Sequence, residues 1–150
     1  APYGVLMMAL LLRVGRGQAV GLAASALRRG CPLTRALSSF SSEREFHDVA
    51  DGVLQRIYDR IESIEDEYDI DLALSQGVLN IETPASGTWV INKQAPNQQI
   101  WWSSPLSGPL RFEYDAVSET WAGTRDQRAL EDRLKEEFEG TLGATIQFRS

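Results

Sequence analysis

Cysteine and histidine are almost absent from this chain, which contains only Cys31 and His47. Cys31 lies in the arginine-rich first part of the sequence, so the remainder has no thiol. A disulfide framework, a zinc ribbon, a cysteine ligand set for an iron–sulfur cluster and a cysteine nucleophile are therefore excluded there. A Ser/His/Asp triad would have to use His47. A long hydrophobic run is also lacking, because the apolar stretch at residues 5–12 is far shorter than the ~20 residues that a membrane span needs.

Acidic residues are missing from residues 1–42, which carry five arginines. These arginines follow the apolar stretch and are interleaved with alanine, glycine and leucine, and serines come after them. An arginine-rich, serine-rich stretch without acids is typical of an organelle transit peptide, whereas a secretory signal places its positive charge before the apolar run. We therefore predict a mitochondrial transit peptide at residues 1–42, with processing near residues 35–37, and a folded domain at residues 43–150 in the mitochondrial matrix.

The predicted domain has the opposite charge balance. Residues 43–150 contain all 21 acidic residues but only ten of the 15 basic ones, which gives a formal charge of −11. Eleven of these acids lie within residues 43–71. Such a balance disfavours nucleic acid and anionic membranes as partners, and it favours cations or basic protein surfaces.

A long amphipathic helix is predicted at the start of the domain. Ser42 and Glu45 have the spacing of a capping box, which places the helix N-terminus at Ser42. Apolar residues then recur at spacings of three and four, at Phe46, Val49, Ala50, Val53, Leu54, Ile57, Ile61 and Ile64. At about 100° per residue, five acids project from the opposite side of this helix. They are Asp48, Asp51, Asp59, Glu62 and Asp66.

The middle of the domain reads as a series of short strands. Apolar and polar residues alternate over residues 70–75, and Gln76-Gly77 offers a turn into the next strand. The predicted strands after this turn are residues 78–83, 87–93, 99–103 and 110–114, with Trp121 on a short last strand. Proline residues punctuate this region.

A second helix is predicted after the strands. Thr124 and Gln127 form another capping box, and the helix would bury Leu130, Leu134 and Phe138 before ending at Gly140. Residues 144–148 alternate weakly and are expected to pack back on the domain. The order helix, strands, helix predicts an α+β fold, a two-layer sandwich in which two helices cover one face of an antiparallel sheet of five to six strands.

Two adjacent tryptophans mark the uncovered face of this sheet. Neighbours in a strand point to opposite faces, so Trp102 is expected in the core and Trp101 on the outer face. By the same alternation Asn92, Gln94 and Arg111 should lie near Trp101. Shielding of the sheet is one interpretation of Trp101, and a binding patch is the other, since Trp and Arg are enriched in interface hot spots.

The acidic side of the first helix also has two interpretations. A solvated helix face is the simpler one. Four like-charge pairs at i,i+3 or i,i+4 each destabilise a helix by roughly 0.2–0.5 kcal/mol, however, and few lysines or arginines are expected on that side. Carboxylates at these spacings, with His47 one turn before Asp51, can bind hard cations such as Ca²⁺, Mg²⁺, Mn²⁺ or Fe²⁺. Exposed carboxylates without a closed coordination sphere should bind such an ion loosely.

Two stretches of the sequence are distinctive. They are GTWVINKQAPNQQIWWSSP at residues 87–105 and SGPLRF at residues 107–112. Together with the acidic first helix, these stretches closely resemble the mitochondrial frataxin family over residues 43–143. The resemblance implies a helix–sheet–helix sandwich and an iron-binding accessory protein of iron–sulfur cluster assembly. It also implies weak ferroxidase activity, and a monomer with possible iron-driven oligomers.

The resemblance further implies which residues act. Those that would bind Fe²⁺ or Fe³⁺ weakly are Glu43, His47, Asp48, Asp51, Asp59, Glu62, Asp66, Asp69 and Asp71. Those that would contact a cysteine desulfurase and its iron–sulfur scaffold protein are Asn92, Gln94, Trp101 and Arg111. This chain departs from the family at Gly52 and Gln55, where many members carry acids, and at Trp102, which replaces a smaller apolar residue.

Two other functions compete with this one. The Trp101 face would serve as a carbohydrate or peptide platform if the acids of the helix only provided solubility. A hydrolase that uses two carboxylates is a poorer hypothesis, because solvated helix acids lack the apolar pocket that separates the pKa values of such a pair.

Overall fold

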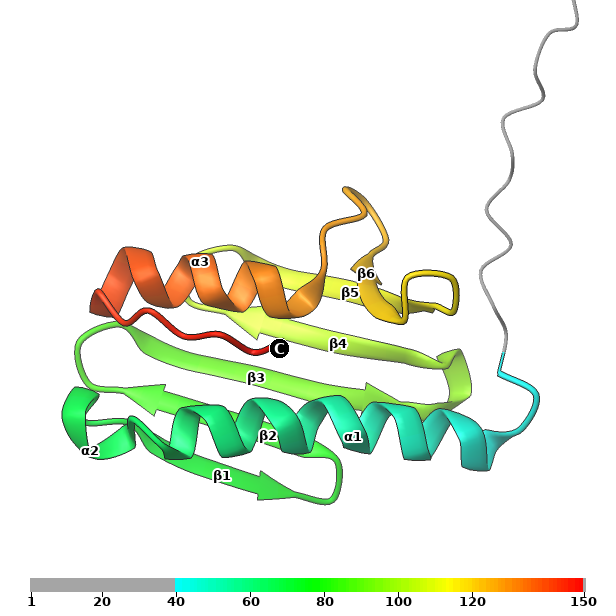
Figure 1. The fold of residues 1–150 in the computed structure, drawn as a ribbon, viewed down its shortest axis with the longest axis horizontal. Coiled ribbons are helices and arrows are strands. Elements are labelled where there is room, and N and C mark those ends of the chain that lie inside the picture. The colour runs from blue at the N-terminus through cyan, green and yellow to red at the C-terminus, as the bar shows by residue number, and fades with distance from the viewer. Residues whose placement is uncertain (1–39, 150) are drawn as a thin grey trace, which may run out of the picture. The chain divides into compact units, whose positions relative to one another are not determined.

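A computed structural model describes residues 40–149, which form a helix layer packed on one face of a sheet (Figure 1). The helices are α1 (Glu43–Glu62), α2 (Glu65–Tyr68) and α3 (Leu130–Leu142), with a 3₁₀ turn η1 at Ala95–Asn97. The strands are β1 (Asp71–Ser75), β2 (Val78–Thr83), β3 (Gly87–Gln94), β4 (Gln99–Ser104), β5 (Gly108–Asp115) and β6 (Thr120–Gly123). Residues 1–39 of the predicted transit peptide lie outside the described residues, whereas its last three residues, 40–42, are described and precede α1. Among those described, no helix has the length and apolar character to cross a bilayer.

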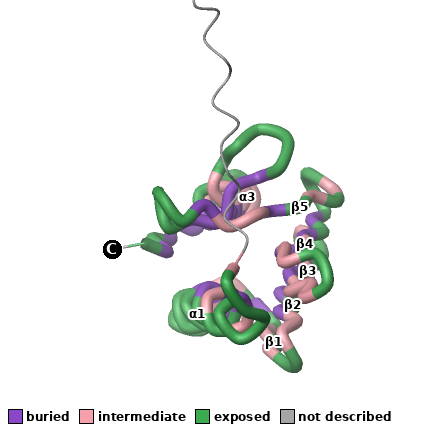
Figure 2. Tube along the Cα trace, turned by 90° about the vertical axis from the view of Figure 1, so that its right-hand side faces the viewer, coloured by how far each residue is buried: buried purple, intermediate pink, exposed green. Residues whose placement is uncertain are grey.

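The six strands form one antiparallel sheet in the order β1-β2-β3-β4-β5-β6. Each strand thus pairs with its neighbour in the sequence, and the predicted α+β sandwich is confirmed. Figure 2 shows the layers from the side, with buried residues where the helices and the sheet face each other. The outer face of the sheet is left without a helix, which is why polar side chains alternate with buried ones along most strands.

Helix α1 begins where the sequence predicts, but its cap differs from a complete capping box. Ser42 is the N-cap, and its Oγ accepts a hydrogen bond from the Glu45 N–H at 3.1 Å. The Glu45 carboxylate does not return to Ser42; it accepts from the backbone N–H and the hydroxyl of Ser41 at 2.8 and 2.5 Å. The helix ends at Glu62, so the predicted continuation to Ile64 is wrong. Ile64 is instead the N-cap of the short helix α2.

The predicted start of the second helix at Thr124 is wrong. The Thr124 N–H donates to the carbonyl of Arg111 in β5 at 3.0 Å, so this residue still belongs to the sheet edge. Gln127 has a positive φ of 59°, which no helix accommodates, and its N–H closes a turn onto the Gly123 carbonyl. The chain therefore completes a tight turn before α3 begins at Leu130.

The predicted end of the second helix is also one turn too early. Gly140 lies inside α3, and Gly143, with φ of 68°, supplies the left-handed residue that ends the helix. Beyond it the tail packs on the domain as expected, because Ala144, Ile146 and Phe148 are buried.

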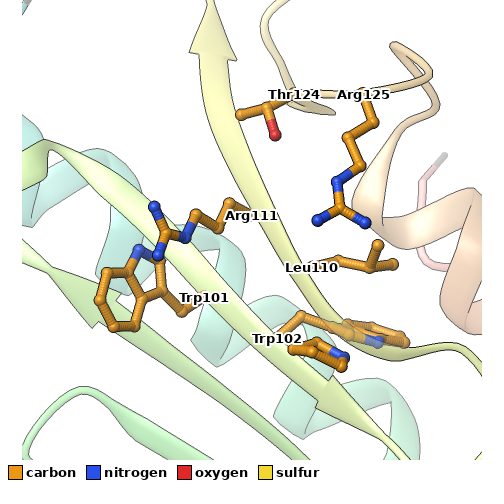
Figure 3. A pocket seen from close by; sticks show the side chains of 7 residues that line it. Trp101, Trp102, Leu110, Arg111, Thr124 and Arg125 are labelled. Carbon is orange, nitrogen blue, oxygen red and sulfur yellow. The ribbon is translucent and has the colours of Figure 1, made fainter.

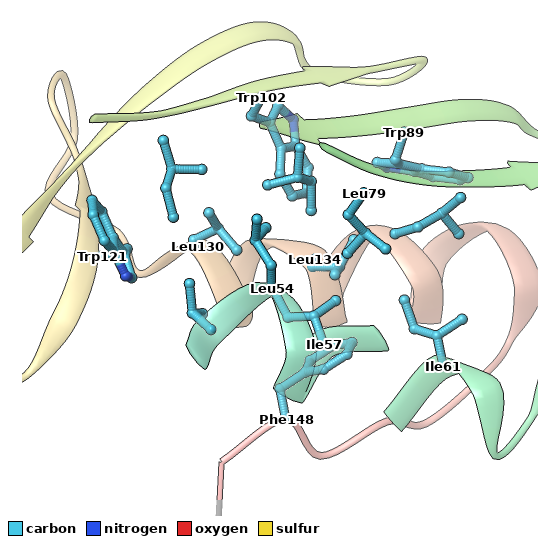
Figure 4. Close-up of a cluster of buried hydrophobic side chains, with 14 of the residues drawn as sticks. Leu54, Ile57, Ile61, Leu79, Trp89, Trp102, Trp121, Leu130, Leu134 and Phe148 are labelled. Carbon is cyan, nitrogen blue, oxygen red and sulfur yellow. The ribbon is translucent and has the colours of Figure 1, made fainter. Parts of the chain in front are cut away.

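The core lies between the two layers (Figure 4). Leu54, Ile57 and Ile61 of α1 and Leu130 and Leu134 of α3 meet the sheet residues in this cluster. Those from the sheet include Leu79, Trp89, Trp102 and Trp121, and Phe148 comes from the tail. The helices thereby fix which face of β4 is buried, and with it which tryptophan faces outward.

Candidate functional site

The first candidate site is the set of side chains that we call the acidic ridge. Six of its members lie on α1, and the others lie on α2, at its C-cap and at the start of β1. They are Glu43, His47, Asp48, Asp51, Asp59, Glu62, Asp66, Asp69 and Asp71. All eight acids are exposed and His47 is half-buried. The helical spacing and the following turn thus present them to solvent, as the sequence predicts.

Local partners hold several of these carboxylates. Glu43 lies 3.6 Å from Nε2 of His47, and the Gln55 amide donates to Asp59 at 2.7 Å. The Tyr58 hydroxyl donates to Glu62 at 3.2 Å. Within residues 40–149, no three side chains of the metal-ligating types gather around one point. A cation on the ridge would therefore meet one or two carboxylates and complete its shell with water.

One basic side chain of the sheet, that of Lys93 in β3, contacts the ridge. The sequence did not predict this contact. Nζ of Lys93 lies 2.6 Å from each carboxylate oxygen of Asp51. The sequence predicts few basic side chains near these acids, and Asp51 is an exception because it forms an ion pair with Lys93. Arg44 also approaches Asp48, at 3.8 Å, with both side chains largely exposed. Asp66, by contrast, has no ion pair with any described residue.

Acids on and beside the ridge disfavour ionisation of two nearby tyrosines. The negative charge of Glu62, together with desolvation, raises the pKa of the Tyr58 hydroxyl above its usual value. Burial and the charge of Glu67 likewise raise the pKa of Tyr68. Because a neighbouring anion disfavours the phenolate, both shifts are signs of a negative potential along α1 and α2.

His47 presents only one of its ring nitrogens to the ridge. Its Nδ1 is buried and has no hydrogen-bond partner among the described residues, and its ring meets Phe46 edge-on at 5.4 Å between centroids. Nε2, beside Glu43, is therefore the atom that can serve as a metal ligand.

The second candidate site is the outer face of the sheet around Trp101. Trp101 is paired across β4 with Asn92 of β3 and with Arg111 of β5, so the three residues form one row. Cζ of Arg111 lies 4.7 Å from the centroid of a Trp101 ring, which is a cation–π contact. Gln94 pairs with Gln99 in the next outward-facing row. The four residues predicted from the sequence therefore lie on one surface.

The two adjacent tryptophans divide as predicted. The Trp102 side chain is in the core, with 2% of its surface exposed. Trp101 is half-buried, because the Arg111 guanidinium covers part of its ring. Its Nε1 donates to the Gln99 side chain at 3.1 Å, which holds the indole in place on the sheet surface.

A cavity of about 580 Å³ opens beside Trp101 (Figure 3). It is lined by Trp101, Trp102, Pro109, Leu110, Arg111, Thr124 and Arg125. Arg125 is exposed and, like Arg111, forms no ion pair with any residue of the described part of the chain. Sequence reasoning missed Arg125 because the predicted helix start at Thr124 would have placed it on a helix. This surface therefore presents two unneutralised guanidinium groups in an acidic domain.

Comparison with known proteins gives one consistent result. A family model described as a frataxin-like domain matches residues 39–144. The mitochondrial frataxin of Dictyostelium discoideum is 44% identical over 96 residues, which cover 62% of this chain and 50% of that protein. The mitochondrial frataxin homologue of Schizosaccharomyces pombe is 40% identical over 111 residues, 72% of this chain and 70% of the homologue.

A solved structure agrees with these relatives. A trimeric frataxin from the yeast Saccharomyces cerevisiae, in a ferrous complex, superposes with a TM-score of 0.57 and 40% identity, over 73% of this chain and 93% of the yeast chain. This chain thus spans between half and seven tenths of the two curated relatives above. Both are named mitochondrial, which confirms the predicted mitochondrial localisation. The fold, the quoted sequence stretches and these matches together show that the chain belongs to the frataxin family.

Proposed function

We propose that this protein binds iron loosely on the acidic ridge and serves iron–sulfur cluster assembly in the mitochondrial matrix. The observation that carries the proposal is the row of exposed carboxylates along α1, which includes Asp48, Asp59 and Glu62. The ferrous complex of the yeast relative supports iron as the cargo.

The chemistry of the ridge suits a carrier or sensor of iron. Carboxylate oxygens are hard ligands that accept Fe²⁺ and favour the harder Fe³⁺. Because each exposed carboxylate is solvated and no closed coordination sphere surrounds it, the bound ion exchanges readily with water and with other ligands. Loose binding permits delivery of iron to a partner, or a signal to that partner that iron is present.

We also propose weak ferroxidase activity at the same ligands. Dioxygen accepts the electrons that the ferrous ions lose, and carboxylates that prefer Fe³⁺ favour this oxidation. The residues of the ridge then act as a negatively charged surface that collects the ions and stabilises the oxidised product. The resulting activity is secondary to the accessory role.

The partner-binding surface in this proposal is the Trp101 face. Asn92, Gln94, Trp101 and Arg111 would contact the cysteine desulfurase and the scaffold protein, and Arg125 extends this surface. A large aromatic ring that is held by Arg111 and Gln99 loses little side-chain freedom on binding, which suits an interface hot spot. We further propose that the protein is a monomer that forms oligomers in the presence of iron; the trimeric yeast relative supports the capacity to form oligomers.

Titration of the protein with Fe²⁺ under anaerobic conditions, followed by NMR, tests the metal site. We expect paramagnetic broadening that is confined to α1, α2 and the start of β1. Asp59→Asn is the test variant. Asp132→Asn is its matched control, because Asp132 is an exposed acid on α3, away from the ridge. Only Asp59→Asn should weaken iron binding. Absence of ferrous uptake at millimolar metal would contradict the proposal.

A further inference from the structure

Lys93 lies between the two candidate sites. Along β3, Asn92 and Gln94 face the outer surface of the sheet, whereas Lys93 faces the helices and reaches Asp51 on α1. Its side chain is 17% exposed, and its Nζ lies 2.6 Å from Asp51 Oδ1. Within residues 40–149, it is the one basic residue outside α1 that forms an ion pair with a member of the acidic ridge.

The position of Lys93 is built into the fold. The aliphatic part of its side chain passes across Gly77, where a Cβ atom would lie 2.3 Å from Lys93 Cε. The backbone N–H of Lys93 also donates to the carbonyl of Gly77 at 3.0 Å. Glycine in the β1–β2 turn thus leaves room for the stem, and the stem directs the ammonium group to Asp51. The Arg44–Asp48 pair has no such support, since its side chains are 90% and 73% exposed.

We propose that Lys93 is an internal counter-ion of Asp51 and that a bound metal ion displaces it. The release of Lys93 then changes the outer face of the sheet, so that this face responds to metal binding on the ridge. The inference rests on the proposed function of the acidic ridge. A divalent ion on Asp51 competes with the ammonium group, because Lys93 holds both oxygens of that carboxylate.

Release of Lys93 loosens the end of β3. Asn92 and Gln94 are its neighbours in the chain, and Asn92 pairs with Trp101 in the register of the sheet. Metal binding at Asp51 therefore changes how firmly β3 holds the row of Asn92, Trp101 and Arg111, which we assign to partner binding. Because such coupling is reciprocal, a partner that prefers the released state of Lys93 raises the affinity of the ridge for metal.

The lysine content of the chain makes the displacement directly measurable. Lys93 and Lys135 are its only two lysines. Lys135 pairs at 3.8 Å with Glu139 on α3, and it serves as an internal reference. The protein is acetylated with limiting acetic anhydride, with and without anaerobic Fe²⁺, and modification of each lysine is measured by mass spectrometry. We expect Fe²⁺ to raise the Lys93-to-Lys135 ratio by about threefold, and Asp51→Asn to give the high ratio without iron.

Two variants that each remove one positive charge test the competition separately. Lys93→Met keeps the stem over Gly77 and should bind Fe²⁺ up to about fivefold more tightly in calorimetry, because the metal no longer breaks an ion pair. Lys135→Met should leave the affinity unchanged. Hydrogen exchange measured by mass spectrometry should show that Fe²⁺ speeds exchange at the end of β3 in the unmodified protein but not in Lys93→Met.

The outcomes separate this inference from the proposed function. Iron uptake on the ridge with an unchanged acetylation ratio, or with equal affinities in the two lysine variants, would overturn the displacement and leave the iron site standing. A changed acetylation ratio without altered hydrogen exchange in β3 would overturn the proposed effect of Lys93 release on the outer face of the sheet. Absence of iron uptake would overturn both proposals.

Discussion

Arg56 of α1 and Glu131 of α3 join the two helices through an ion pair, with 2.8 Å between Nε and Oε1. The Glu131 side chain is only 6% exposed, and Nε of Arg149 in the tail approaches its other oxygen at 3.7 Å. One buried carboxylate therefore connects both helices and the C-terminal segment. The pair also explains why Arg56, although it lies on the acidic helix, does not neutralise the ridge.

Loss of Arg56 should destabilise the fold. In Arg56→Met the Glu131 carboxylate stays buried with only the distant Arg149 as a partner, and an uncompensated buried charge is costly. Because Arg56 itself is 47% exposed, we expect a loss on the order of 2 kcal/mol in the free energy of unfolding, below the range for fully buried pairs. Urea denaturation measures it. Arg60→Met is the matched control, since Arg60 is exposed on the same helix, and it should cost about 0.5 kcal/mol or less. Equal losses in the two variants would show that the pair contributes nothing specific.

Most of the sheet could be predicted because its two faces meet different surroundings. Helices cover one face and water the other, so alternation in the sequence reports directly on burial, and the assignment of Trp101 and Trp102 followed from it. The pattern Thr124-x-x-Gln127 was misleading because tertiary contacts, which local spacing does not report, decide the structure of these residues. Its hydrogen-bond partners are Arg111 and Gly123, and a pairing of Thr124 with a strand 13 residues earlier cannot be inferred from local spacing.

The acidic ridge could likewise be predicted as a surface, but its internal contacts could not. Helical periodicity placed the carboxylates on one side of α1. The approach of Lys93 to Asp51 joins residues 42 positions apart, and it depends on the space left at Gly77. Arg125 was missed because its place beside Trp101 depends on a turn that resembles a helix cap.

Truncation of Trp102 should affect mainly folding stability, whereas truncation of Trp101 should affect mainly partner binding. Trp102→Ala leaves a cavity in the core and should cost about 3–5 kcal/mol of folding stability. Trp101→Ala loses the cation–π contact with Arg111, about 0.5–1 kcal/mol at an exposed site, and should leave the fold intact. If Trp101 binds the assembly complex, this variant should abolish stimulation of sulfur transfer in a reconstituted assay. A folded Trp101→Ala protein with full stimulation would refute that role.

Neutralisation of one ridge acid should stabilise the protein while it weakens iron binding. Asp66 forms no ion pair with a described residue and lies between Glu65 and Glu67 on α2, so Asp66→Asn removes repulsion among neighbouring exposed carboxylates, worth on the order of a few tenths of a kcal/mol. We expect a slightly higher Tm, an effect that fades at high salt, together with a lower affinity for Fe²⁺. Scanning calorimetry and an anaerobic titration measure the two quantities. A fall in both Tm and affinity would instead indicate that Asp66 is structural.

The N-terminal cap of α1 should become weaker in acid through Glu45. Hydrogen bonds from the side chain and backbone of Ser41 lower the pKa of this carboxyl from its ordinary value of 4.5. A group whose folded-state pKa is depressed contributes stability above its unfolded pKa, and the contribution is lost as pH falls through the folded value. Glu45→Gln should therefore lower Tm at neutral pH, and the difference from the unmodified protein should shrink below about pH 4. Glu43→Gln, in the same first turn, controls for the helix dipole, because its carboxylate accepts no hydrogen bond from Ser41. A Tm difference for Glu45→Gln that stays constant down to low pH would show that the Ser41 contacts do not stabilise the charged carboxylate.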